Sequence, residues 1–265
     1  MNVKRQTESP IHHRLLEGVL RRLANSLHAS SFALRGGMLL RHWFRPLPRF
    51  AGDLDLAATF PFDVEETERR LGALLTAPNI GDGIVFDSRR RVRGIWLNTD
   101  FPGVRMHAAG RIGPNSHVFS VDVTFGEELF PPPEQAPYVL SSGDSFPLWM
   151  CRPETIVGRK LHALWRMGVR HWRPKDLDDL RLLLDAAAMD QQQLAEATAV
   201  SFSSRGDPRG AARSLFAAET WWNTKTAEAR WLDFAAAAAH EVPEILTGVV
   251  AEVEEKLRPV WERLR

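Results

Sequence analysis

The chain of 265 residues contains a single cysteine, Cys151. One thiol excludes a disulfide framework and a cysteine-rich zinc site. A chain of this length can be stabilised by its own hydrophobic core instead. Because the fold needs no disulfides, the sequence fits a reducing compartment, and we predict a cytoplasmic location.

Long apolar stretches are also missing. No run is long enough to span a bilayer, and the segment MNVKRQTESPIHHRLLEG has no uninterrupted apolar core of the kind found in signal peptides. We therefore expect a soluble protein with no membrane partner.

Excess charge of one sign is scarce too. A formal net charge of +1 argues against a globally basic coat for nucleic acid, although local basic patches remain compatible with it. Lysine is rare, with five among 34 basic residues. Two of the five, Lys160 and Lys175, lie in the C-terminal segment that carries candidate chemistry.

The first half of the chain mixes helix and strand patterns. Apolar spacing predicts a helix over 11–27, and further elements are expected as a strand at 31–35, a helix at 38–44, a loop at 45–52, a strand carrying Asp53 and Asp55, and a helix over 62–77. Three stretches rich in β-formers, at 84–98, 104–113 and 117–126, predict an antiparallel meander. The proline-dense segment 127–154 is predicted to connect two lobes.

The second half has only helical patterns. Four or five helices are expected within 153–168, 174–189, 191–199, 211–240 and 243–264. The predicted class is therefore α/β (α+β), with a first domain over 1–150 and an all-helical domain over 151–265.

Asp53 and Asp55, in the segment DLDLA, are the strongest candidate metal ligands. On a strand, residues i and i+2 project from the same face, so the two carboxylates are expected to lie together. Two like charges at short range need a compensating cation, and hard oxygen ligands suit Mg²⁺. On the last strand of the meander, Asp122 projects from the face opposite Val121 and Val123 and is a candidate third carboxylate.

Gly36 and Gly37 end an apolar run and precede a helical pattern. Glycines at a helix N-terminus let backbone N–H groups approach an anion closely, so this turn is a candidate phosphate site. A plain turn is the alternative.

Lys160 borders the apolar face of the helix expected at 153–168, and Asp176 and Asp179 share a face of the next helix. The lysine is suited to binding a triphosphate, and one of the carboxylates can serve as a general base. The alternatives are a lysine that extends into solvent and an aspartate that compensates the helix dipole.

The segments GGMLLRHW, RFAGDLDLA, SVDVTFG, ETIVGRKLHAL and RPKDLDDLRLL follow one another in this order. Over roughly residues 30–185 the chain thereby resembles the AbiEii family of nucleotidyltransferase toxins, the toxic halves of type IV toxin-antitoxin and abortive-infection systems. The family lies within the nucleotidyltransferase superfamily related to DNA polymerase beta. Relatives often carry Ser or Thr just before the first aspartate, where this chain has Ala51 and Gly52.

The resemblance implies a bilobed protein with a mixed sheet that uses Mg²⁺ to transfer a nucleoside monophosphate from an NTP to an acceptor. In some relatives the acceptor is the 3′ end of tRNA, which halts translation, and a cognate antitoxin is the expected partner. The implied site residues are Asp53, Asp55 and Asp122 for metal; Gly36, Gly37, Arg41 and Lys160 for the nucleotide; and Asp53, Asp55, Lys160, Asp176 and Asp179 for catalysis. Of the last two, Asp176 is the first choice for the catalytic carboxylate and Asp179 the second.

Two other classes of function stay open at this point. A nucleotidyltransferase that modifies a small molecule, such as an aminoglycoside, would share the aspartate pair but should offer an acidic acceptor pocket. A non-catalytic nucleic-acid-binding module would need only a basic groove, for which Arg89, Arg90, Arg91 and Arg93 are the best local candidates.

Overall fold

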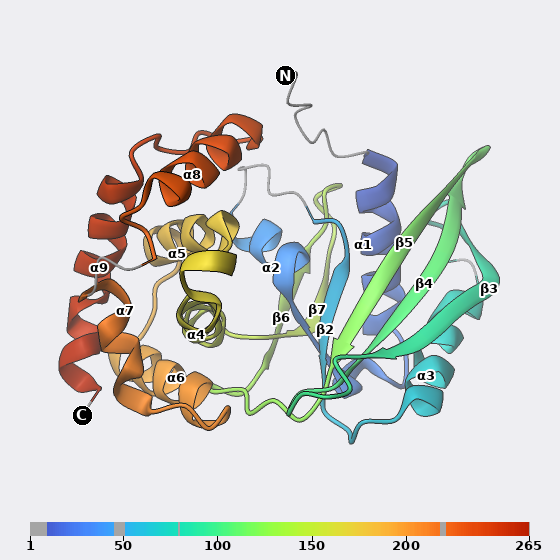
Figure 1. Cartoon of the computed structure of the whole chain (residues 1–265). Helices are drawn as coiled ribbons and strands as arrows, with labels where there is room; N and C mark the ends of the chain where they lie inside the picture. Colours follow the sequence, from blue (N-terminus) through green and yellow to red (C-terminus); the bar gives the residue numbers. More distant parts are fainter. Residues whose placement is uncertain (1–9, 45–50, 79, 218–220, 265) are drawn as a thin grey trace.

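The computed structural model describes residues 10–44, 51–78, 80–217 and 221–264 (Figure 1). In this part of the chain, seven strands form one mixed sheet in the order β3-β4-β5-β2-β1-β7-β6. The strands are β1 Phe32–Arg35, β2 Leu54–Ala58, β3 Ile84–Ile95, β4 Gly103–Ile112, β5 Asn115–Thr124, β6 Glu134–Val139 and β7 Ser145–Met150. β2 runs parallel to β5 and β1 parallel to β7, while the other neighbours are antiparallel.

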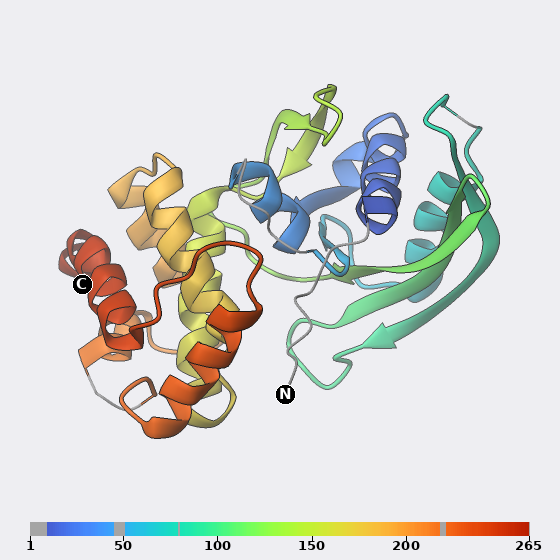
Figure 2. The same ribbon diagram turned by 90° about the horizontal axis from the view of Figure 1, so that it is seen from above.

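Helices α1 (Pro10–Ala24) and α3 (Val64–Thr76) lie on the same side of the meander β3–β4–β5, as Figure 2 shows. The apolar side chains of α1 pack onto this sheet, with Leu15, Leu16 and Leu20 fully buried. Helix α2 (Gly36–Trp43) follows β1 directly and contacts β1, β2 and helix α5 of the C-terminal half. The opposite face of the meander carries Asp122, which pairs in register with Asp55 of β2.

The C-terminal half is helical. Its elements are α4 Pro153–His171, α5 Pro174–Ala186, α6 Gln191–Ser203, the 3-10 turn η2 Arg209–Arg213, α7 Ser214–Ala217, α8 Lys225–Ala237 and α9 Leu246–Arg263. Buried apolar side chains from both halves form one continuous cluster, so the helices and the sheet share a core. Within the described residues, no helix combines the length and the apolar character needed to cross a bilayer.

An ionic cluster around Glu127, between β5 and β6, also joins the two halves. Its carboxylate accepts hydrogen bonds from Arg35 at 2.6 Å and from Arg205 at 2.9 Å, and it contacts Arg159 of α4. Burial alone would raise the pKa of Glu127, but the charges of Arg35, Arg159 and Arg205 hold it well below its usual range. This carboxylate is therefore a charged anchor between sheet and helices.

The structure confirms the predicted fold class, a mixed sheet with flanking helices and a helical C-terminal region. The meander also has the predicted antiparallel pairing. The first helix ends at Ala24, three residues before its predicted end. Most of the loop predicted at 45–52 lies outside the described residues.

The prediction for 127–154 is wrong. This segment contains the antiparallel hairpin β6–β7, and β7 joins the sheet beside β1. Prolines are tolerated there because Pro137 lies on an edge strand opposite Pro147, where neither needs to donate a ladder hydrogen bond. The boundary between domains at residue 150 stays a prediction, although β7 ends at Met150 and α4 begins at Pro153.

The helix expected over 211–240 is also wrong as one element. Helix α7 ends at Ala217 and α8 begins at Lys225, and residues 218–220 lie outside the described residues. Thr224 caps the N-terminus of α8 by accepting a hydrogen bond from the Ala227 N–H. The cap starts a new helix where apolar periodicity alone predicts continuation.

Candidate active site

Three carboxylates meet where β2 and β5 run side by side. Asp55 of β2 pairs in register with Asp122 of β5, and Asp53 directly precedes β2. Asp53, Asp55 and Asp122 each have a carboxylate oxygen within 4.8 Å of the others. The structure thus brings together the residues that the sequence singles out as candidate metal ligands.

The mutual repulsion of these groups is visible at Asp53. Burial raises the pKa of Asp53, and the negative charges of Asp55 and Asp122 raise it further. Lys175 and Arg105 act in the opposite direction but do not cancel the effect. A bound cation would relieve this repulsion.

Asp122 is partly neutralised by a residue that sequence reasoning missed. Arg105 lies opposite Asp122 on β4 and binds its carboxylate with both Nε and Nη2, the first contact measuring 2.6 Å. Asp122 is 3% exposed, so the carboxylate of this ion pair has almost no contact with water. A cross-strand partner 17 residues away leaves no local signal in the sequence.

Gly36 makes room for the Asp55 carboxylate. It adopts φ +67°, and a β-carbon at this position would stand 1.9 Å from Asp55 Oδ2. Gly36 and Gly37 are the first two residues of α2, so the predicted glycine turn forms the N-terminus of the helix itself. His12 of α1 adds support by donating a hydrogen bond from Nε2 to the Gly52 carbonyl oxygen, next to Asp53 (3.1 Å).

On the helical side, Lys160 holds two carboxylates together. Its ammonium Nζ lies 3.0 Å from Asp176 Oδ1 and 2.7 Å from Asp179 Oδ2. Arg173 also donates to Asp176, at 2.6 Å. Burial alone would raise the pKa of Asp176, but the charges of Lys160 and Arg173 lower it.

A cleft of about 730 Å³ lies between the two halves. The sheet side contributes Gly37, Asp53 and Asp55, and the helical side contributes Lys175 and Asp179. The remaining lining residues are Ala51, Gly52, Trp172, Arg173, Pro174, Asp178, Arg230, Asp233, Phe234, Ala237, Ala238, Ala239 and His240.

Some predicted site residues are not part of the cleft wall. Lys160 and Asp176 lie outside it and contact it through Asp179 and Arg173. Arg41, further along α2, is outside it as well, so its role in nucleotide binding stays a prediction. Lys175, to which no role was assigned from the sequence, is exposed at the start of α5 and is the lysine that lines the cleft.

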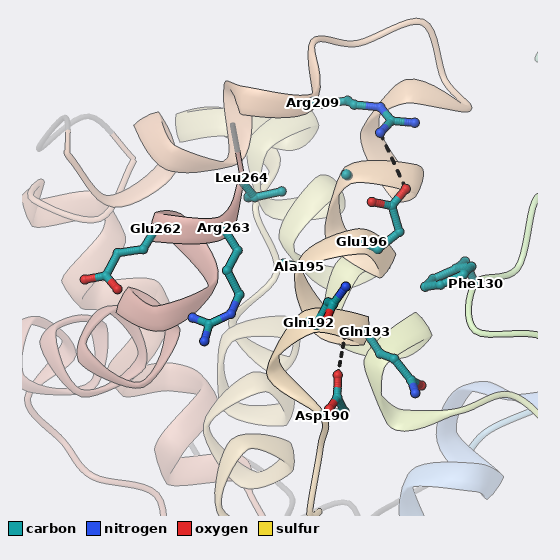
Figure 3. Close-up of a pocket in the computed structure, with 11 residues that line it drawn as sticks. Phe130, Asp190, Gln192, Gln193, Ala195, Glu196, Arg209, Glu262, Arg263 and Leu264 are labelled. Atoms are coloured by element: carbon teal, nitrogen blue, oxygen red, sulfur yellow. Dashed lines mark hydrogen bonds and ion pairs between the residues drawn. The ribbon is translucent and has the colours of Figure 1, made fainter.

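A second cavity, of about 850 Å³, lies in the helical half (Figure 3). Its walls include Gln193 of α6 and Arg263 of α9, and the ion pair between Arg209 and Glu196 crosses its rim at 3.4 Å. It contains none of the predicted site residues. This cavity is therefore not the candidate active site, although it is larger than the cleft.

A family model described as nucleotidyl transferase AbiEii toxin, Type IV TA system, matches residues 18–259. The chain belongs to the AbiEii family. The match covers the sheet, the cleft and nearly all of the helical half, so the family assignment extends well beyond the motifs at residues 30–185. No curated protein sequence matches the chain.

Solved structures agree with the fold of this AbiEii chain. JHP933 from Helicobacter pylori is 16% identical, with a TM-score of 0.53 over 97% of this chain and 95% of that chain. A second protein from H. pylori, a candidate nucleotidyltransferase, is also 16% identical, with a TM-score of 0.50 over 97% of both chains. At this identity the likeness concerns the fold alone.

The donor set of the AbiEii site fits a hard divalent cation. Asp53, Asp55 and Asp122 offer only carboxylate oxygens, and part of Asp53 and Asp55 remains accessible from the cleft. Mg²⁺ is commonly bound by a small number of carboxylates and keeps its other positions for water or phosphate. The three carboxylates leave room for that arrangement.

Proposed function

We propose that this chain transfers a nucleoside monophosphate from an NTP to an acceptor hydroxyl, and that the acceptor is the 3′ end of tRNA. The hydroxyl oxygen forms a bond to the α-phosphorus, the bond from the α-phosphorus to the β-phosphate breaks, and pyrophosphate leaves. One observation supports this proposal most strongly: Asp53 and Asp55, two of the three clustered carboxylates, line a cleft whose helical side carries Lys175 and Asp179. A negatively charged metal site opposite a cation is the arrangement that a metal–triphosphate substrate needs.

Asp53, Asp55 and Asp122 are the proposed ligands of Mg²⁺. When bound, Mg²⁺ would supply charge neutralisation for the phosphates and favour an ionised acceptor hydroxyl. The Asp122–Arg105 pair fixes the orientation of the third carboxylate before any ion binds.

The other site residues are proposed to contact the phosphates or to position the general base. The N-terminus of α2 presents the Gly37 backbone to the phosphates, where the helix dipole favours negative charge. Lys175 reaches them from the opposite wall. Lys160 fixes Asp179, the proposed general base, at the edge of the cleft. Asp176 is held by two cations and is better suited to positioning Lys160 than to accepting a proton.

Incubating the purified protein with each labelled NTP, Mg²⁺ and total tRNA tests the proposal. We expect label in tRNA with the wild type and none with Asp53→Ala or Asp55→Ala, while the circular dichroism of both variants stays that of the wild type. Retained labelling in both variants would refute the assignment of the metal site.

A small-molecule acceptor is the second candidate, because Asp178 and Asp233 also line the cleft and make part of it acidic. Asp178 is already bound to His240, at 2.7 Å, and to Arg181, at 2.8 Å, which leaves Asp233 as the carboxylate available to a cationic acceptor. The same assay with a panel of aminoglycosides in place of tRNA distinguishes the two acceptors.

The toxin role requires a cytoplasmic protein and a cognate antitoxin. We expect growth arrest when the protein is expressed in a bacterial host, and recovery when Asp53→Ala is expressed instead. Co-expression of a neighbouring antitoxin gene should also restore growth. Arrest that persists with Asp53→Ala would separate toxicity from nucleotidyl transfer.

A further inference from the structure

A row of charged residues crosses the sheet from the candidate active site toward its free edge. Arg93 pairs with Arg105, Arg105 with Asp122, and Asp122 with Asp55, each across one pair of strands. Residues directly opposite one another project from the same face of a sheet. The arginines therefore lie on the face that carries the carboxylates.

This face of β3 and β4 is open on the described part of the chain. Helices α1 and α3 pack on its reverse, where Gly110 lies against Leu15 and Gly72 against Arg90. Arg91 pairs with His107 on the open face, and both side chains are exposed. We call Arg91, Arg93, Arg105, His107 and Trp96 together the open basic face.

Positive charge on this face is only partly balanced. Arg105 is paired with Asp122, but Arg91 and Arg93 form no ion pair with any residue that the structure describes. Neighbouring strands lie about 4.8 Å apart, so Arg93 stands roughly 14 Å from Asp55, three strands away. The unbalanced charge thus begins within a few nucleotides of the proposed reaction centre.

Trp96 adds an aromatic surface beside these arginines. The residue is 48% exposed, and its indole packs over Gly103, where a β-carbon would stand 2.9 Å from Trp96 Cε3. Gly103 pairs with Thr124, two residues beyond Asp122, so the ring lies against the strand position that is two residues along β4 from Arg105. Trp96 has φ +55°, an unfavourable backbone conformation for a bulky residue, and it is the one non-glycine residue with positive φ in the described chain.

Arginines that follow a path to the site and an exposed aromatic ring are the two features that bind single-stranded nucleic acid. We propose that the open basic face holds the acceptor polynucleotide, with Arg91 and Arg93 on its phosphates and Trp96 stacked on a base next to the reacting 3′ end. This inference rests on the proposed transfer to an RNA acceptor. It adds where the acceptor lies and which residues hold it.

The test uses two double variants with the same change of charge on opposite faces. Arg91→Ala/Arg93→Ala removes the proposed phosphate contacts, and Arg14→Ala/Arg69→Ala removes two exposed arginines from α1 and α3 on the reverse side. Filter binding of tRNA is measured over a range of salt concentrations, together with calorimetric binding of the Mg²⁺–NTP complex.

We expect Arg91→Ala/Arg93→Ala to bind tRNA at least tenfold more weakly and to lower the slope of log K against log salt by about 1.4, since each lost contact to a single strand removes about 0.7. The control variant should match the wild type. Nucleotide binding should be unchanged in both, and the KM for tRNA should rise without a change in the KM for NTP.

Trp96 is tested by two substitutions. Trp96→Ala should weaken tRNA binding about tenfold or more, whereas Trp96→Phe should retain most of the affinity because it keeps an aromatic face. A loss of equal size in both variants would indicate a structural role and overturn the stacking assignment.

The outcomes also separate this inference from the proposed function. If the wild type labels tRNA and Arg91→Ala/Arg93→Ala does so with the same KM, the open basic face is not the acceptor site, and a partner such as an acidic protein becomes its better occupant. If the wild type neither binds nor labels tRNA but still binds Mg²⁺–NTP, the RNA acceptor itself is wrong, and the inference fails with it.

Discussion

The α-carbon of Gly36 lies against the carboxylate of Asp55, so closely that a β-carbon would stand 1.9 Å from Asp55 Oδ2. Glycine is therefore required at the first position of α2 because any side chain there would displace the Asp55 carboxylate. The proposed phosphate site at the N-terminus of α2 depends on the same residue, because Gly36 is the first residue of that helix.

Replacing Gly36 by alanine should displace Asp55 and abolish nucleotidyl transfer. Gly113→Ala is the matched control, since Gly113 has a similar φ of +64° and nothing within 4 Å of its would-be β-carbon. Both variants should lose about 1–2 kcal/mol of stability from backbone strain, but only Gly36→Ala should lose activity. Urea unfolding and the labelling assay measure the two effects, and equal activity in the two variants would contradict the contact.

Asp53→Asn should stabilise the protein when no divalent metal is bound, because it removes one of three mutually repelling charges. We expect a higher Tm than the wild type in EDTA, by about 2–4 °C for each kcal/mol gained. Adding Mg²⁺ should raise the Tm of the wild type and have little effect on the variant, since a ligand stabilises only the state that binds it. Differential scanning calorimetry in both conditions provides the comparison, and an unchanged wild-type Tm with Mg²⁺ would argue against the metal site.

The two lysines of the site should behave differently. Lys175 is exposed, so Lys175→Ala should raise the KM for NTP about tenfold or more by removing a charged contact to phosphate, and leave stability within about 0.5 kcal/mol. Lys160→Met should destabilise the protein by about 3–5 kcal/mol, because it leaves Asp176 and Asp179 buried without their shared cation. Steady-state kinetics and urea unfolding on both variants test this division, which fails if Lys175→Ala is the less stable of the two.

Glu127 should make the fold sensitive to acid. Its pKa is lowered in the folded protein, so its contribution is complete above the ordinary value of 4.5 and is lost progressively as the pH falls below that value. Glu127→Gln should be about 3–5 kcal/mol less stable than the wild type at pH 7, where three arginines lose their common partner. The difference should shrink below pH 4.5, as measured by unfolding in urea at pH 7 and pH 3.5. A difference independent of pH would show that the loss is one of packing.

The candidate site was predictable where its chemistry is local. The placement of Asp53 and Asp55 on one face follows from strand geometry. Helix faces and the resemblance to known toxins single out Lys160, Asp176 and Asp179, but the ion pairs that join these three residues were not predicted. Asp122 was predictable as a strand residue on the correct face, since alternation along β5 determines that face.

Contacts between elements that are far apart in the sequence could not be predicted in this way. Arg105 meets Asp122 through the register of β4 on β5. Trp96, which lies against Gly103, has a positive φ that no sequence pattern indicates. The β6–β7 hairpin was missed because its prolines give the segment the composition of a linker. Pro137 lies on the edge strand β6 opposite Pro147 of β7, an arrangement that only the assembled sheet reveals.

The lateral row from Arg93 to Asp55 depends on four strands keeping one alignment. A slip of one residue between any two of them would turn these charges toward the apolar layer under α1 and α3, since alternate residues face opposite sides. A misaligned sheet would therefore have a higher free energy, because arginine and aspartate side chains would be buried among apolar residues. Correct strand pairing and the meeting of the three carboxylates are therefore one event, because Asp53, Asp55 and Asp122 come together only when these strands are in register.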